Sequence, residues 1–423
     1  MLGILAQLGA LLLSATVLLA GNGLQTTLLP LRAGIEAFPP FSIGVMGSSY
    51  FVGFVGGCLT TAHLVRHVGH IRVFTAMVAA ASVVPLIHVL TVEQWVWWVL
   101  RAITGFCIAA LFLVIESWLN EKAENRTRGT IFSIYTTLTF VAIIGGQVLI
   151  PFYDPALFPL FALTSIIISV AAIPIALTSS AQPPLPAEVR LRPIRLVKLS
   201  PVGALGCLVV GLSNGAFWAL GPVFAADVGL GTTRIAVFIG VTVLGGALSQ
   251  WPLGRLSDRL DRRVVTTIIS ILAAVTGIGL FLASRFWNPG ILPLAFAFGV
   301  FSFPVYALSV AHVNDLITSE SFVEVSGGLL LVNGLGSVFG PLAGALAMAM
   351  MGPGGLFLYV ALVFLLLAAF ALMRMRSTPR PAESHSADFV TVADTAVAAP
   401  VFDPRTEDAA ETDEMPQPEP RPE

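Results

Sequence analysis

Two charged residues stand inside long apolar stretches of this 423-residue sequence, and they are the side chains best placed to do chemistry. Arg101 lies about six residues into one stretch, and Glu116 lies near the opposite end of the same stretch. A charge inside a membrane is costly, so each is a functional candidate. Arg101 could bind an anionic substrate, or extend to the interface beside neighbouring tryptophans. Glu116 could accept a coupling proton, or form a structural pair with Arg66 or Arg72.

Uncharged polar and aromatic residues at similar depth form a second set of candidates. Asn22 and Gln25 lie three residues apart, and Asn214 and Trp218 lie four apart, so each pair shares one face of a helix. Such residues either contact a substrate or bond a neighbouring helix. The predicted substrate-binding residues are Asn22, Gln25, Tyr50, Arg101, Tyr135, Asn214, Trp218, Tyr306 and Asn333.

The composition indicates that membrane helices position these residues. Hydrophobic residues make up 56% of the chain and charged residues 11%, whereas a soluble domain averages about a quarter charged. Only helices and closed barrels span a bilayer, and the long, unalternating apolar runs select helices. Runs of about 20 apolar residues occur near 5–31, 41–65, 72–91, 95–119, 129–151, 157–178, 201–226, 233–254, 264–284, 290–313, 323–350 and 355–376. We therefore predict an all-α integral membrane protein with twelve transmembrane helices.

The distribution of charge predicts the orientation and the domains. Lys and Arg concentrate in alternate loops, which places those loops and both termini in the cytoplasm of an inner-membrane, multi-pass protein. The expected domains are a six-helix bundle at 1–178, a cytoplasmic linker at 179–199, a second bundle at 200–376 and a tail at 377–423. The tail contains eleven Asp or Glu and three Arg with few large apolar residues. It is predicted to be disordered and cytoplasmic.

The two halves of the sequence match when one is shifted by 192 residues, and later by 194. The matched pairs include Asn22-Gly23 with Asn214-Gly215, Pro30 with Pro222, and Asn120-Glu121 with Asn314-Asp315. Two related bundles around a shared midplane site suit alternating access, in which the site opens to one side at a time.

Three motifs resemble those of the major facilitator superfamily. Residues 254–263, Gly-Arg-Leu-Ser-Asp-Arg-Leu-Asp-Arg-Arg, are similar to its loop motif, except that Asp261 stands where Gly is usual. Arg101-x3-Gly105-x3-Ala109 is similar to its fourth-helix motif, and residues 336–344 to its glycine-proline motif. Segments 47–51, 116–117 and 250–252 resemble the YcaD-like branch. The resemblance implies two pseudo-symmetric six-helix bundles, the major facilitator fold.

The sequence also departs from this pattern. In the first-half loop Ala62 takes the Gly place and Arg66 the Asp place, and Gly146-Gln147 replaces the Gly-Pro pair of proton-driven antiporters. The resemblance implies that Asp258 lies near Arg126 and Arg128, and the internal repeat places Arg66 near Glu320 and Glu324. Our hypothesis is that these two sets of charges form latches that join the halves when the cytoplasmic side is closed. The alternative is ordinary solvated loop charges. The predicted gating residues are Arg66, Glu116, Arg126, Arg128, Gly254, Asp258, Arg259, Glu320 and Glu324.

The leading prediction is a secondary active transporter that moves a small, neutral to singly charged molecule by alternating access, with proton coupling left open. The absence of a Gly-x4-Gly-Lys-(Ser/Thr) loop argues against ATP hydrolysis, and the few intramembrane acids and histidines argue against an enzyme. The alternative is a transporter-derived sensor or scaffold whose acidic tail recruits a partner. No cofactor, metal site or nucleic-acid partner is expected; the partners are the substrate, the lipid bilayer and a coupling proton, and the chain is expected to be a monomer.

Overall fold

The computed structural model describes residues 2–122, 125–177, 200–316 and 322–377, although the side chains of 2–7, 121–122, 125–129, 322–324, 326 and 377 fall outside the description. The predicted linker at 179–199 and all but the first residue of the predicted tail therefore lie outside the described residues. In chain order, the described residues form the helices α1 (Leu2–Ile35), α2 (Pro40–Val68), α3 (His70–Leu90), α4 (Gln94–Lys122), α5 (Asn125–Leu149), η1 (Ile150–Phe152), α6 (Phe158–Val170), α7 (Ala172–Ala176), α9 (Pro201–Asp227), α10 (Thr232–Arg259), α11 (Arg262–Phe286), η2 (Asn288–Gly290), α12 (Ile291–Ser302), α13 (Pro304–Asn314), α14 (Phe322–Met351) and α15 (Gly355–Ser377).

The described residues contain twelve spans that are long and apolar enough to cross a membrane, and the structure is all-α. The predicted fold class is therefore confirmed. The span limits differ from the sequence-based limits by only a few residues in most cases. The largest shift is the extension of Thr232–Arg259, in which a polar helix end continues beyond the apolar run predicted at 233–254.

Two of the twelve spans are interrupted helices, and a proline accounts for each break. The sixth span combines α6 and α7, and the tenth combines η2, α12 and α13. Pro174 lacks the N–H that would bond the carbonyl of Val170, and Pro304 lacks the N–H that would bond the carbonyl of Val300. The breaks therefore follow from local sequence.

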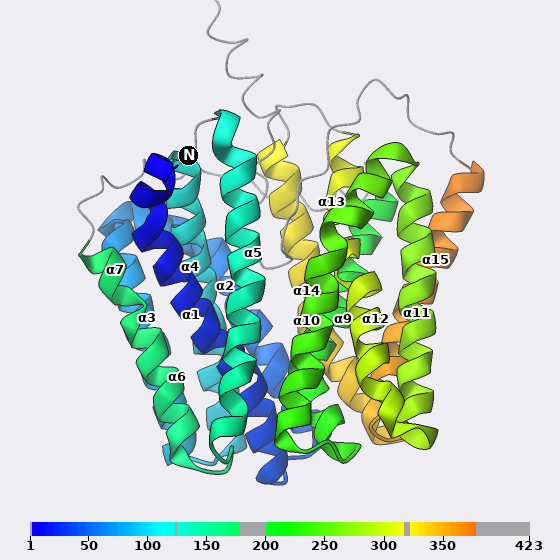
Figure 1. The fold of residues 1–423 in the computed structure, drawn as a ribbon, viewed down its shortest axis with the longest axis horizontal. Coiled ribbons are helices and arrows are strands. Elements are labelled where there is room, and N and C mark those ends of the chain that lie inside the picture. Colours follow the sequence, from blue (N-terminus) through cyan, green and yellow to red (C-terminus); the bar gives the residue numbers. More distant parts are fainter. Residues whose placement is uncertain (1, 123–124, 178–199, 317–321, 378–423) are drawn as a thin grey trace, which may run out of the picture.

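The spans lie in two groups, α1–α7 on one side of the molecule and α9–α15 on the other (Figure 1). We call these groups the N-half and the C-half. Within each half, glycines let helices approach closely. A Cβ at Gly53 of α2 would clash with the carbonyl of Ala102 on α4, and one at Gly105 of α4 would clash with the carbonyl of Tyr50 on α2. Such close backbone approach is typical of membrane helix packing.

The halves contact each other where α2 begins and α14 ends. Ser48 of α2 donates a hydrogen bond to the carbonyl of Val338 on α14, with an O–O distance of 2.6 Å. A Cβ at Gly44 would lie 2.8 Å from the carbonyl oxygen of Pro341 and 2.8 Å from Cβ of Ala345, both on α14. Helices α5 and α10 also contact each other, and they converge toward the lower end of the view (Figure 1). The interface between the halves is therefore tight at one end of the bundle.

Candidate functional site

Arg101 lies about two turns beyond the start of α4 and is buried in the N-half, with 5% of its surface exposed. Its guanidinium carbon lies 4.4 Å from the centre of the Tyr50 ring on α2. Among the described residues, its Nε and Nη1 atoms have no hydrogen-bond partner. Arg101 therefore does not extend to a solvent-exposed interface, and it keeps donors that a bound group could use. A buried guanidinium with unused donors is costly unless a partner binds it.

Helix α1 places two more predicted residues among the buried groups of the N-half. Gln25 is 1% exposed, and neither its Oε1 nor its Nε2 has a hydrogen-bond partner among the described residues. Asn22, one turn earlier, is half-buried, and its Oδ1 likewise lacks a partner there. Buried amides are normally hydrogen-bonded. These two side chains therefore offer donors and acceptors to a polar ligand.

Glu116 is fully buried on α4, between helices α2 and α5. Its carboxyl interacts electrostatically with the Tyr135 hydroxyl of α5 and with the Cys58 thiol of α2. The structure thus brings together a predicted gating residue, Glu116, and a predicted substrate-binding residue, Tyr135. A carboxyl in this setting can exchange a proton with little competition from bulk water.

The C-half supplies Asn214 and Trp218 from α9, Tyr306 from α13 and Asn333 from α14. Asn214, Tyr306 and Asn333 are buried, and Trp218 is half-buried, with its ring 6.2 Å from that of Phe303. Helices α9 and α14 pack so closely that a Cβ at Gly211 would clash with the carbonyl of Asn333. Helices α1 and α9, which carry the repeat-related Asn22 and Asn214, are in contact.

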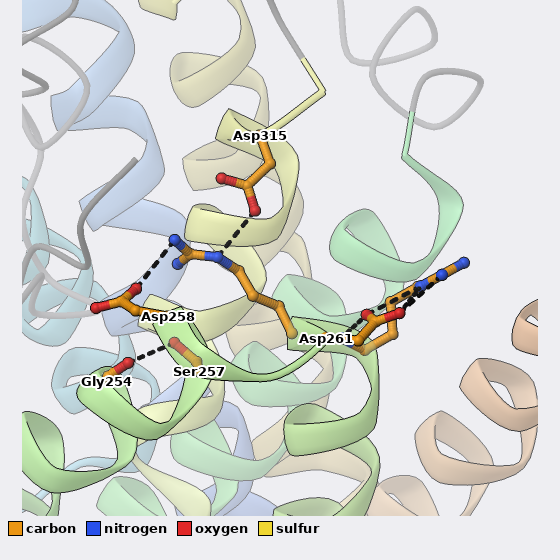
Figure 2. Close-up of polar contacts among 7 residues, drawn as sticks. Gly254, Ser257, Asp258, Asp261 and Asp315 are labelled. Carbon is orange, nitrogen blue, oxygen red and sulfur yellow. Dashed lines mark hydrogen bonds and ion pairs between the residues drawn. The ribbon is translucent and has the colours of Figure 1, made fainter. Parts of the chain in front are cut away.

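The last turns of α10 carry the motif residues Gly254, Ser257 and Asp258, and the motif continues into the start of α11 (Figure 2). The Arg262 guanidinium bonds two carboxylates: its Nη2 lies 3.2 Å from Oδ1 of Asp258, and its Nε lies 2.8 Å from Oδ2 of Asp315. Ser257 donates a hydrogen bond to the carbonyl of Gly254, with an O–O distance of 2.6 Å. The motif thus ties α10 and α11 to the residue that follows α13. These contacts all lie within the C-half.

Asp261, the residue that departs from the family motif, begins α11. Its carboxylate accepts a hydrogen bond from the backbone N–H of Arg263 at 2.9 Å and pairs with Nη2 of the same residue at 2.8 Å. An acid at this position caps the helix and favours its positive end. Burial raises the pKa of Asp261, but the hydrogen bonds and charge of Arg263 outweigh it and hold that pKa below its ordinary value. The departure is therefore a helix cap.

The two predicted latches are only partly within the described residues. The side chains of Arg126, Arg128, Glu320 and Glu324 lie outside the description. Arg66 is half-buried near the end of α2, and Arg259 is exposed at the end of α10. The pairing of these residues across the halves stays a prediction.

Two residues that the sequence did not identify as ligands or gates tie elements together. Gln147 of α5 accepts a hydrogen bond from Thr27 at 2.7 Å and donates one to the carbonyl of Gly23 at 2.9 Å, both on α1. Gln147 stands where antiporters of the resembled family carry proline. The sequence therefore shows that the residue differs, but its hydrogen bonds to α1 could be found only in the structure. Arg262 was also missed, although its spacing from Asp258 suits a helical i,i+4 pair.

The described residues contain twelve spans in two groups of six, with buried polar groups in both, which is the arrangement expected of a membrane transport protein. The chain belongs to the Major Facilitator Superfamily, whose sequence profile matches residues 11–327 and, in a second match, residues 203–405. It is 26% identical over 376 residues to an MFS-type transporter of Escherichia fergusonii called YcaD, covering 88% of this chain and 97% of that protein. It is 26% identical to an MFS-type transporter of Enterobacter sp., covering 84% and 92%. The resemblance to the YcaD-like branch is thereby confirmed.

Solved structures share the fold. The nucleoside transporter NupG matches with a TM-score of 0.71 and 14% identity, covering 88% of this chain and 99% of that one. A bacterial homologue of the lysosomal transporter Spinster, in an inward-facing and occupied conformation, matches with a TM-score of 0.70 and 14% identity, covering 89% and 98%. The fold and the family together identify a multi-pass inner-membrane protein of a transporter family.

Proposed function

We propose that this protein is a secondary active transporter that moves a small, singly charged anion across the inner membrane by alternating access, coupled to protons. The observation that carries the choice of substrate charge is Arg101, which is buried and has two guanidinium nitrogens without a partner among the described residues. A carboxylate or similar anion would accept a charge-assisted hydrogen bond from either of these nitrogens. Gln25 and Asn22 offer the neutral hydrogen-bonding groups that would orient the rest of the molecule.

Among the described residues that are predicted to bind the substrate, Arg101 is the one buried arginine, and this limits the charge of the substrate. Within the membrane, an anion with two or more charges would need further cations, because an uncompensated buried charge is strongly unfavourable. Arg101 stacks on Tyr50, an aromatic face that suits an apolar or planar portion of a ligand as well as the cation. The proposed substrate is therefore an amphipathic monoanion.

We assign the coupling proton to Glu116. Its carboxyl is fully buried and faces the Tyr135 hydroxyl and the Cys58 thiol. Both Glu116 and Arg101 lie on α4, so protonation at one end of the helix and anion binding at the other can act on the same rigid element. If Glu116 is protonated in one conformation of the transporter and charged in the other, the difference in proton binding shifts the equilibrium between the two conformations.

The contacts between the halves support alternating access, with the halves moving as rigid domains. The interactions of Gly44 and Ser48 with α14 lie in the first third of α2. Further along α2, Leu59 is 52% exposed, and Thr60 is exposed as well. With the basic loops and both termini in the cytoplasm, we infer that this arrangement is closed on the periplasmic side and that the transporter works as a monomer.

The experiment that tests the substrate charge starts from untargeted metabolite profiles of deletion and overexpressing cells. Candidate molecules are then measured for flux in proteoliposomes that contain the wild type, Arg101→Gln or Arg234→Gln. Arg234 is an exposed arginine near the start of α10 and serves as the matched control. We expect monoanions among the altered metabolites, and flux reduced about 100-fold or more in Arg101→Gln only, as expected for a lost charge-assisted contact of about 2–3 kcal/mol or greater. Neutral substrates carried equally well by Arg101→Gln would overturn the proposal.

A further inference from the structure

The end of α2 and the start of α3 carry three histidines within eight residues. Under the 192-residue shift that relates the two halves, they fall on arginines: His63, His67 and His70 correspond to Arg255, Arg259 and Arg262. An arginine keeps its charge and has no lone pair to give to a metal ion, whereas a neutral imidazole has one. At this position the N-half therefore has side chains that can bind a metal ion, whereas the equivalent side chains of the C-half cannot.

Two of these histidines form a pair on one face of α2. His63 and His67 are four residues apart, and their ring centres are 4.2 Å apart with an interplanar angle of 48°. Both side chains are exposed, so an ion from solution can reach them. His70 differs, because it is 1% exposed and stacks on Trp118 with ring centres 6.2 Å apart. The pair therefore excludes His70.

The hydrogen bond of His67 fixes which of its nitrogens can bind a metal. Its Nδ1 lies 2.8 Å from the carbonyl oxygen of His63. A carbonyl can only accept, so Nδ1 carries the proton and, in the neutral ring, Nε2 keeps its lone pair. Metal-binding histidines commonly donate their second nitrogen to a backbone carbonyl in this way, which fixes both the tautomer and the ring orientation.

We propose that His63 and His67 together bind one divalent transition-metal ion of the Zn²⁺ or Cu²⁺ class, with water completing its coordination. Imidazole nitrogen suits these metals and not Mg²⁺ or Ca²⁺, which prefer oxygen. Two ligands one helical turn apart can hold one ion, as in helices that present a His-x3-His pair to zinc. The ion would add positive charge near the end of α2 beside Arg66, for which a latch is predicted.

The test uses the full-length protein, purified in detergent without a histidine tag and titrated calorimetrically with ZnCl₂. We expect saturable binding of one ion per chain. His63→Ala and His67→Ala should each weaken it about 100-fold or more, because the second ligand of a chelate acts at a high effective concentration. His385→Ala, which changes a histidine far from this pair in sequence, is the matched control and should bind as the wild type does. No saturable binding, or equal affinity in all four proteins, would overturn the proposal.

Two further readouts separate loss of the site from loss of folding. Without metal, the His63→Ala and His67→Ala proteins should melt at the wild-type temperature, because exposed side chains contribute little to stability. Added Zn²⁺ should raise the melting temperature of the wild type and of His385→Ala, but not that of His63→Ala or His67→Ala. With Cu²⁺, electron paramagnetic resonance should show coupling to two imidazole nitrogens in the wild type and to one in either variant. Coupling unchanged in both variants contradicts the assignment.

Discussion

Arg262 and Asp315 form an ion pair that connects two elements of the C-half, with Nε of the guanidinium 2.8 Å from Oδ2 of the carboxylate. The same guanidinium reaches Asp258 at 3.2 Å, and its side chain is only 5% exposed. One buried arginine therefore neutralises two carboxylates from α10 and from the end of α13. It can hold these elements together while the C-half moves as a unit.

Replacing this arginine should destabilise the protein. In Arg262→Gln the two carboxylates lose their shared cation, and breaking a buried pair costs about 3–5 kcal/mol. The prediction is a clear fall in the melting temperature in detergent, partly recovered by Arg262→Lys, which restores charge without the two-pronged geometry. Arg259→Gln, at the exposed end of α10, should change the free energy of unfolding by less than about 0.5 kcal/mol. Equal melting of Arg262→Gln and Arg259→Gln would refute a structural role for the pair.

The Thr27–Gln147 hydrogen bond joins α1 to α5 inside the N-half. In Thr27→Val a side chain of similar shape leaves Oε1 of Gln147 without this donor, which should lower the free energy of unfolding by about 1–3 kcal/mol. Thr26→Val is the matched control, because the Thr26 hydroxyl bonds a carbonyl of its own helix, that of Asn22. Chemical denaturation of the two variants in the same detergent compares them directly. If they unfold alike, Gln147 does not bind the two helices together.

Glu116→Gln should separate transport from its driving force. The amide keeps the size of the side chain but cannot gain or lose a proton in this pH range. We expect accumulation driven by an imposed pH gradient to disappear in proteoliposomes, whereas exchange of labelled for unlabelled substrate, which needs no net proton movement, continues. Glu93→Gln, an exposed glutamate just before α4, should retain both activities. Gradient-driven accumulation by Glu116→Gln at the wild-type level would remove Glu116 from the coupling mechanism.

Asp261 should make stability depend on pH in the acidic range. Hydrogen bonds from Arg263 hold the pKa of this carboxyl below its ordinary value in the folded protein. Its contribution is therefore complete above the unfolded-state pKa, about 3.9, and is lost as the pH falls through the lower folded-state pKa. The wild type should melt at a higher temperature than Asp261→Asn at pH 7, and the difference should shrink below about pH 4. A difference that stays constant across this range would show that the carboxylate charge is unimportant.

The sequence predicted the fold because the signals for it are local and strong. Runs of about 20 apolar residues fix the number of spans, and the structure contains all twelve among its described residues. Proline effects also act over one turn, yet the breaks before Pro174 and Pro304 were not predicted, because proline is tolerated inside α1, α9 and α10. Whether a helix bends or breaks at proline depends on which neighbours satisfy the freed carbonyl.

The candidate site was less predictable, because side-chain partners depend on packing. Sequence reasoning selected Arg101 from its cost in a membrane, but not its position over Tyr50. It weighed Arg66 or Arg72 as partners for Glu116, and the structure places Tyr135 and Cys58 beside that carboxyl. The pairing of His63 with His67 had a sequence signal in their four-residue spacing and in their alignment with arginines of the C-half. Spacing shows which residues share a helix face, whereas contacts between helices need the fold.

The measurement that tests alternating access most directly is a reversible cross-link between the halves. Cysteines replace Ser48 and Val338, whose hydroxyl and carbonyl oxygens are 2.6 Å apart, in a background from which Cys58, Cys107 and Cys207 have been removed. Oxidation should lock the two halves together at this end, and each single-cysteine variant reports the effect of oxidation alone. We expect the flux of the substrate to fall at least about tenfold in the cross-linked protein and to return on reduction, because a site that opens to one side only cannot complete the cycle. Full flux through a completely cross-linked protein would contradict it.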